Sequence, residues 1–94
     1  MIGVIAKLTV KPGMETEFET HAKALVAKVN ANEDDCLYYD LYKSKEGGVY
    51  VFMEKYKDQA ALTAHGKTEY FAAAQAPLGA CLAAAPEIEY FQAV

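Results

Sequence analysis

The chain has 94 residues, of which 53% are hydrophobic and 23% charged, and its formal net charge is −4. This length fits a single domain over residues 1–94, and the composition is typical of a folded protein rather than a disordered segment. The acidic balance and the lack of any run of basic residues disfavour a phosphate-binding surface, so no nucleic-acid partner is expected.

The first third of the chain predicts a strand and then a helix. Residues 2–10 are rich in β-branched side chains and predict the strand, which residues 11–13, Lys-Pro-Gly, should end. Residues 14–32 place apolar side chains three or four positions apart, as one stripe of a helix requires. The strand places Val4, Ala6, Leu8 and Val10 on one face, and the helix places Met14, Phe18, Ala22, Leu25, Val26 and Val29 on its stripe.

The middle of the chain predicts a β-hairpin. Residues 36–42 and 49–56 read as strands, and the Lys-Glu-Gly-Gly segment at 45–48 reads as the turn between them. Large apolar side chains occupy both faces of these strands. In the first strand, one face holds Leu37, Tyr39 and Leu41, and the other holds Cys36, Tyr38 and Tyr42. In the second strand, one face holds Val49, Val51 and Met53, and the other holds Tyr50, Phe52 and Tyr56.

A second helical region follows, and it is interrupted. Asp58 can cap a helix that runs to His65, Gly66 would allow a bend, and Thr68 can open a further helix. Pro77 should open, kink or end a turn in that further helix. The helix is expected to carry Phe71, Ala74, Leu78 and Leu82 before Pro86 closes the region and residues 88–94 form a last strand.

The resulting β-α-β-β-α-β order predicts an α+β, ferredoxin-like fold with a four-stranded antiparallel sheet and its helices on one face. A sheet that is apolar on its uncovered face usually marks an interface. We therefore predict a homodimer in which two sheets meet, with an aromatic-lined ligand pocket between each sheet and its helices. The alternative is a monomer with an unusually apolar surface.

The chain has few candidates for catalytic or metal-binding groups. His21 lies among carboxylates on the first helix and is interpreted as a surface residue. His65 could face a cavity at the helix bend, or it could pack and cap the last carbonyls of its helix, and the local sequence favours neither. Cys36 and Cys81 are too few and too far apart to predict a disulfide framework or a zinc site, so no metal is expected.

Nothing in the sequence predicts a membrane segment. No stretch approaches the ~20 apolar residues of a membrane-spanning helix. The N-terminal apolar run is short and precedes Lys7, unlike the layout of a signal peptide. We expect no membrane partner and a cytoplasmic location.

Four segments together resemble the antibiotic biosynthesis monooxygenase family. Residues 2–19 include the strand end Val-Lys-Pro-Gly, and residues 32–44 include a Glu-to-Cys turn before a Tyr-containing strand. Residues 51–71 include a Glu-x-aromatic strand end followed by Ala-x-x-x-His. Residues 86–91 form the final motif, Pro-Glu-Ile-Glu-Tyr-Phe. The resemblance implies a ferredoxin-like subunit that pairs into a dimeric α+β barrel with one pocket per subunit. It also implies oxidation of hydroquinones, anthrones or related phenolics by molecular oxygen without metal or flavin cofactor.

The resemblance assigns roles to particular residues. His65 falls on the family's helix-end histidine and is the implied catalytic proton acceptor. Tyr56 stands where relatives often have Trp, and Tyr70 where they have a second His; both could donate hydrogen bonds to a phenolic oxygen, or could fill the core. Phe52 and Tyr39 are expected to line the substrate pocket, although aromatic residues on strands are more often core.

Other functions stay open at this stage. The missing Trp, and Ala6 in the region where haem-degrading relatives carry Asn, disfavour haem chemistry. An isomerase acting on a small phosphorylated signal is weakened by the absence of Arg. A non-catalytic dimeric ligand-binding module remains an alternative because the Trp and one His are replaced. Glu54 is expected to be structural, either in a bond across the dimer or at the wet edge of the sheet.

Overall fold

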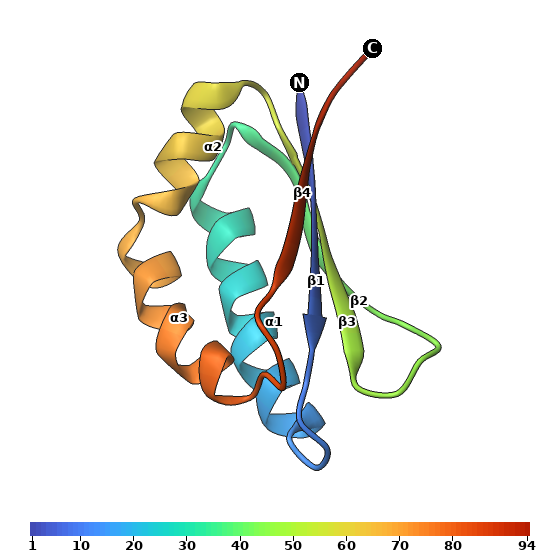
Figure 1. The fold of residues 1–94 in the computed structure, drawn as a ribbon. Helices are drawn as coiled ribbons and strands as arrows, with labels where there is room; N and C mark the ends of the chain where they lie inside the picture. The colour runs from blue at the N-terminus through green and yellow to red at the C-terminus, as the bar shows by residue number, and fades with distance from the viewer.

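The computed structural model describes residues 1–94, which form two layers: a four-stranded antiparallel sheet and three helices on one of its faces (Figure 1). The strand order across the sheet is β2-β3-β1-β4. The predicted α+β, ferredoxin-like fold is confirmed. The elements in chain order are β1 (Ile2–Thr9), α1 (Glu15–Asn32), β2 (Cys36–Lys43), β3 (Val49–Tyr56), α2 (Gln59–Gly66), α3 (Glu69–Ala80) and β4 (Glu87–Gln92).

Helix α1 supplies much of the dry core. Its apolar side chains recur every three or four residues and therefore face the sheet as one stripe. The Phe18 ring lies 4.8 Å from the ring of Tyr50 on β3. The Tyr50 hydroxyl donates a 2.5 Å hydrogen bond to Glu19 Oε2, which satisfies its polar end. The buried residues of α1 are Phe18, Ala22, Leu25 and Val29.

The two shorter helices each begin at a side-chain cap. Asp58 Oδ1 accepts a 2.9 Å bond from the third N–H of α2, as predicted. Thr68 Oγ1 caps α3 and also donates a 3.0 Å bond to the carbonyl of His65. Gly66 is the last residue of α2 and has no positive φ, so the prediction that its backbone freedom makes the bend is wrong. The Thr68 hydroxyl, which joins the end of α2 to the start of α3, gives the break its physical basis.

Helix α3 continues through Pro77, so the prediction that this proline would open or end a turn is wrong, while a kink at Pro77 stays a prediction. Pro77 lies one turn before the end of the helix, where a single missing N–H removes only one internal hydrogen bond. Leu82 lies beyond α3 and forms an isolated bridge with Val10 rather than extending the helix. Strand β4 begins one residue earlier and ends two residues earlier than predicted.

A β-bulge changes which side chains of β2 face the helices. The pairing shifts between Cys36 and Tyr38, which brings Cys36 opposite the fully buried Tyr56. Leu37 is 47% exposed as a result. The prediction that Leu37 shares the inner face with Tyr39 is therefore wrong, because the extra residue turns Cys36 inward in its place.

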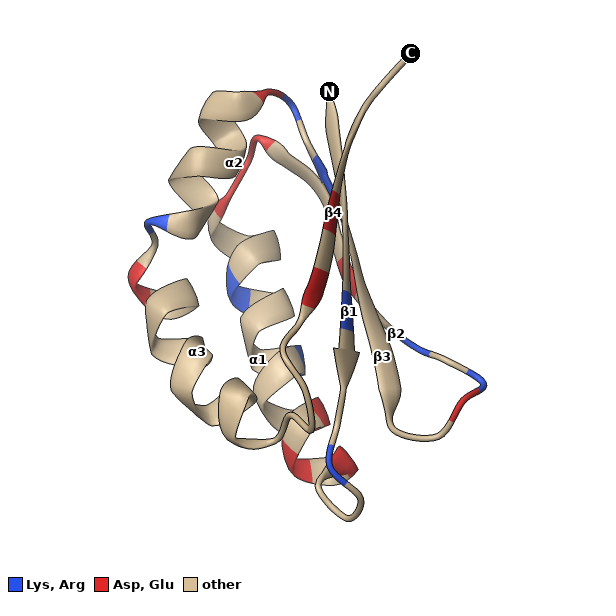
Figure 2. Ribbon diagram, in the orientation of Figure 1, with Lys and Arg blue, Asp and Glu red and all other residues tan.

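The outer face of the sheet, which no helix covers, mixes apolar and charged side chains. Its exposed apolar residues are Ile5, Tyr38, Tyr42, Met53 and Phe91. Its charged residues are Lys7, Asp40, Lys55, Glu87 and Glu89, and Figure 2 shows the acidic pair along β4. This face is less uniformly apolar than the sequence of the hairpin alone suggested, since β1 and β4 bring lysines and glutamates to it.

The two ends of the chain lie at the same end of the sheet (Figure 1). The N–H of Ala93 donates a 3.0 Å bond to the carbonyl of Met1, which extends the pairing of β1 with β4. None of the three helices combines the length and the apolar character that crossing a bilayer requires.

Candidate active site

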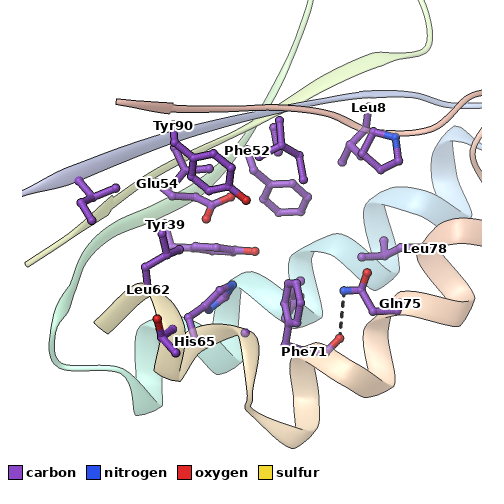
Figure 3. A pocket seen from close by; sticks show the side chains of 18 of the residues that line it. Leu8, Tyr39, Phe52, Glu54, Leu62, His65, Phe71, Gln75, Leu78 and Tyr90 are labelled. Carbon is purple, nitrogen blue, oxygen red and sulfur yellow. Dashed lines mark hydrogen bonds between the residues drawn. The ribbon is translucent and has the colours of Figure 1, made fainter. Parts of the chain in front are cut away.

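A pocket of about 760 Å³ lies between the inner face of the sheet and helices α2 and α3. This volume is within the range of about 300–1,000 Å³ that small-molecule sites occupy. Most of its lining is apolar, so a few polar groups decide what it can bind. Figure 3 shows Phe52, Glu54 and Tyr90 on the sheet side and Leu62, His65, Phe71, Gln75 and Leu78 on the helix side.

The pocket exists because helix α3 is built from small residues. Between Phe71 and Pro77 its sequence is Ala-Ala-Ala-Gln-Ala. Strand β4 has no helix packed on it, and all six of its residues are exposed. Ile88 and Tyr90 face inward, opposite Ala6 and Val4 of β1, yet remain uncovered. The pocket therefore opens to solvent along β4.

His65 lies in the wall of this pocket, on α2, and is 4% exposed. Aromatic rings surround it, with centroid distances of 5.2 Å to Tyr39, 5.4 Å to Tyr56 and 4.7 Å to Phe71. These contacts hold the imidazole ring in one orientation between the sheet and the start of α3 (Figure 3).

A carboxylate fixes the tautomer of His65. Its Nδ1 lies 3.0 Å and 3.1 Å from the two carboxylate oxygens of Glu33, the residue that follows α1. The hydroxyl of Tyr70 donates a hydrogen bond to Glu33 Oε2. A neutral imidazole that donates from Nδ1 keeps Nε2 as an acceptor. Nε2 forms no hydrogen bond. Every fully buried polar side-chain atom of the protein does have a hydrogen-bond partner, so Nε2 is not fully buried and is open to the pocket.

Glu54 is the second ionisable group of the pocket. It lies on β3, opposite Tyr39 of β2 and Val4 of β1, and so faces inward. The hydroxyl of Tyr56 donates a 2.7 Å hydrogen bond to Glu54 Oε1. Burial raises the pKa of Glu54 to about 7, although the Tyr56 hydrogen bond opposes this shift. Glu54 lines the pocket and is bonded within its own subunit, so the expectation that it lies at the wet edge of the sheet is wrong, while a bond across a dimer stays a prediction.

The structure brings three of the five predicted site residues into the pocket lining: His65, Tyr39 and Phe52. Tyr56 and Tyr70 lie outside that lining and each donates to a carboxylate instead, Tyr56 to Glu54 and Tyr70 to Glu33. Burial raises the pKa of both Tyr39 and Tyr56, so both stay neutral hydrogen-bond donors. Substrate contact by any of the five stays a prediction.

Sequence reasoning missed Glu33 as a functional residue and misplaced Glu54. Glu33 lies 32 positions from His65 in the chain, and no local pattern links the two. Glu54 does have a local signal, since it alternates with Phe52 and Tyr56 on a strand whose same-face neighbours are aromatic. A carboxylate at such a position is costly to bury and is a marker of a site.

No group of three or more His, Cys, Asp or Glu side chains converges to hold a metal ion. A second, more polar hollow lies on the other side of Glu33, between the end of α1 and the start of α2. Its acidic side chains are Glu33, Asp34, Asp35 and Asp58.

The fold and the pocket define a class, namely ferredoxin-like α+β proteins with a mostly apolar pocket between sheet and helices. The chain belongs to the antibiotic biosynthesis monooxygenase family, whose pattern matches residues 1–77. It is 37% identical to "Putative monooxygenase YcnE" of Bacillus subtilis over 71 residues, 76% of this chain and 75% of the relative.

Two further relatives extend this similarity. "Putative monooxygenase Rv0793" of Mycobacterium tuberculosis is 31% identical over 81 residues, which are 86% of this chain and 79% of the relative. A crystal structure of a "putative antibiotic biosynthesis monooxygenase" from Caulobacter crescentus is 51% identical and superposes with a TM-score of 0.96. That alignment covers 99% of this chain and 89% of the other. The predicted family is thereby confirmed.

Proposed function

We propose that this protein is a monooxygenase that oxidises an electron-rich aromatic, such as a hydroquinone, with molecular oxygen and no cofactor. The observation that carries the proposal is the open Nε2 of His65, an oriented proton acceptor in the wall of an apolar pocket. The family and the names of the relatives support the general class of reaction. The phenolic substrate is the one that the family resemblance implies, and an apolar pocket with one oriented proton acceptor is consistent with it.

His65 has the position and the tautomer of a general base. Its Nε2 can accept the proton of a phenolic hydroxyl, while the Glu33 carboxylate bonded to Nδ1 stabilises the imidazolium that forms. The phenolate so produced is electron-rich enough to reduce O₂ directly. On the sides formed by the sheet and the helices, apolar side chains keep water from the phenolate and hold its ring in place.

Tyr39 and Phe52 are suited to orient the ring of the substrate. Their own rings lie 5.4 Å apart and form part of the sheet side of the pocket. Aromatic side chains favour offset or tilted contact with another ring. A flat aromatic ligand would therefore lie against them with one hydroxyl directed to His65.

The test is oxygen consumption by purified, metal-stripped protein with a panel of hydroquinones. Uptake should exceed autoxidation, and His65→Ala should lower the rate by roughly 100-fold or more, the usual contribution of a general base. His21→Ala, on the half-exposed side of α1, is the matched control and should keep the wild-type rate. Ligand binding without any turnover would instead indicate a binding module, and turnover without oxygen use an isomerase; either result would overturn the proposal.

We also propose that the protein forms a homodimer through the outer face of the sheet. Ile5 and Met53 lie side by side near its centre and are 40% and 41% exposed in the single subunit. Apolar surface of this kind is stabilised when a second copy covers it. Met53→Lys should shift the sedimentation of the protein toward the monomer at micromolar concentration, whereas Ala24→Lys on the exposed side of α1 should not. A wild-type protein that already sediments as a monomer would contradict the proposal.

A further inference from the structure

The pocket holds a second proton-carrying group on the wall opposite His65. Glu54 projects from the sheet, in an inner-face row that runs Tyr39, Glu54, Val4 and Tyr90 across the four strands. His65 projects from α2 on the helix side, and Figure 3 shows the Tyr39 ring between the two. Both side chains line the same pocket, so a ligand beside the Tyr39 ring would have one ionisable side chain near it on the sheet and another on α2.

Glu54 has no cation to balance its charge. No Lys or His forms an ion pair with it, and its one hydrogen bond comes from the neutral hydroxyl of Tyr56. An unpaired carboxylate in an apolar site is costly, which favours its protonated form. Near neutrality such a carboxyl can both give and accept a proton. The titratable groups around it are Tyr56 on its own strand, Tyr39 and Cys36 on β2, His65 on α2, Glu33 after α1 and Tyr90 on β4.

Resting on the proposed function, we propose that Glu54 is a second catalytic residue, which protonates the peroxide formed on the substrate and then removes the proton of the ring carbon that carries it. His65 acts on the hydroxyl of the substrate, and Glu54 acts on the carbon that O₂ attacks. The two residues thereby divide the proton transfers of one reaction between two walls of the pocket.

The step balances for a hydroquinone with a free ring position. His65 takes the hydroxyl proton, and the phenolate passes an electron to O₂, after which the two radicals join through a new C–O bond. Glu54 protonates the terminal oxygen and then, as a carboxylate, takes the C–H proton while the O–O bond breaks and a C=O bond forms. The hydroxide that leaves takes the proton held by His65. One oxygen atom enters the ring, the other becomes water, all four electrons come from the substrate, and both side chains return to their starting states.

This scheme defines the substrate class more closely. The ring carbon that is oxygenated has to carry hydrogen, because Glu54 has no proton to remove from a fully substituted ring. Methylhydroquinone should give a hydroxyquinone with one atom from ¹⁸O₂. Tetramethylhydroquinone, in which every ring position is blocked, should bind but give no oxygenated product.

The experiment compares Glu54→Gln with His65→Ala in two assays. The first is anaerobic binding of methylhydroquinone, where phenolate absorbance reports the step assigned to His65. The second is formation of the ¹⁸O-labelled product across a range of pH. Glu54→Gln should keep the phenolate signal and lose product formation by roughly 100-fold, whereas His65→Ala should lose both. Glu54→Asp should recover part of the rate, and Glu46→Gln, in the exposed β2–β3 turn, should match the wild type.

The pH profile separates catalysis from a structural role. Product formation should fall on the alkaline side of about pH 7 as Glu54 loses the proton that it donates. That decline should be absent in Glu54→Gln, and it should move to higher pH in Tyr56→Phe, because the Tyr56 hydrogen bond lowers the pKa of Glu54. A Glu54→Gln protein with the wild-type rate and profile would overturn this inference alone. A wild-type protein that makes the phenolate but no oxygenated product would overturn the proposed function as well.

Discussion

The inner face of the sheet has a filled half and a hollow half. Beneath α1 it is closed by side chains such as Phe18 and Val29, which are fully buried. Beneath α3 it faces alanines and Gly79, and about 760 Å³ stays open. The sheet contributes apolar residues to both halves, so the difference lies in the size of the helix side chains. One half stabilises the fold, and the other leaves room for a ligand.

This division predicts that truncating a phenylalanine to alanine lowers the free energy of unfolding by different amounts in the two halves. Phe18→Ala should lower the free energy of unfolding by about 3–5 kcal/mol, because it leaves a cavity in the closed half. Phe71→Ala should cost about half as much, since the ring of Phe71 is only partly buried and already borders the pocket. Urea unfolding of the two variants at one protein concentration measures both values. Equal losses would show that the hollow half contributes as much stability as the filled half.

The hollow half should also carry a stability cost that depends on pH. The pKa of Glu54 rises from 4.5 to about 7 on folding, so the contribution of its neutral form is fully present below about pH 4.5 and is lost as the pH rises through 7. Each pH unit between these values corresponds to about 1.4 kcal/mol, so Glu54→Gln should be more stable than the wild type by about 3 kcal/mol at pH 8. The two proteins should be nearly equal at pH 4.

Chemical denaturation at pH 4 and pH 8 measures this difference. A gain at pH 8 together with lost activity would separate the catalytic role of Glu54 from folding. The same difference at both pH values would mean that the charge of Glu54 is not its cause.

Gly79 in the hollow half and Gly48 in the turn between β2 and β3 should respond in opposite directions, with the smallest effects of the three comparisons. A Cβ at Gly79, in α3 beside the pocket, would meet no atom within 4 Å, so Gly79→Ala should stabilise the protein by about 0.4–1 kcal/mol. Gly48 has a φ of +77° and its Cβ would lie 3.1 Å from the carbonyl of Val10, so Gly48→Ala should destabilise it. Thermal unfolding of both variants measures the two effects. A loss of stability in Gly79→Ala would indicate that α3 lies closer to the sheet than the structure shows.

The sequence predicted the fold because its signals are local. The stripe of α1, the Asp58 cap and the alternation of β3 depend on neighbours within a few positions, and each appears where expected. The errors arose at two positions. Pro77 lies one turn from the end of α3, where the helix continues through it, and the bulge at Cys36 reverses the start of β2.

The site was less predictable than the fold. His65 could be proposed from the family resemblance, but its orientation depends on Glu33, which is distant in sequence and is brought near by the packing of α1 against the second helical region. The hydroxyls of Tyr56 and Tyr70 bond carboxylates instead of reaching the pocket, and no local sequence pattern predicts these two hydrogen bonds. The alternation of β3 already groups Glu54 with Phe52 and Tyr56, but the strand register is needed to show that this group faces the pocket.

The hydrogen bond between Ala93 and Met1 places the two ends of the chain within reach of a short connecting peptide. Such a peptide would close the backbone into a ring without displacing β1 or β4. The ring could then be reopened in the exposed segment between β2 and β3, at the end of the hairpin away from α2 (Figure 1). The arrangement of the elements around the pocket is thus separable from their order along the chain, and a circularly permuted gene would encode the same pocket.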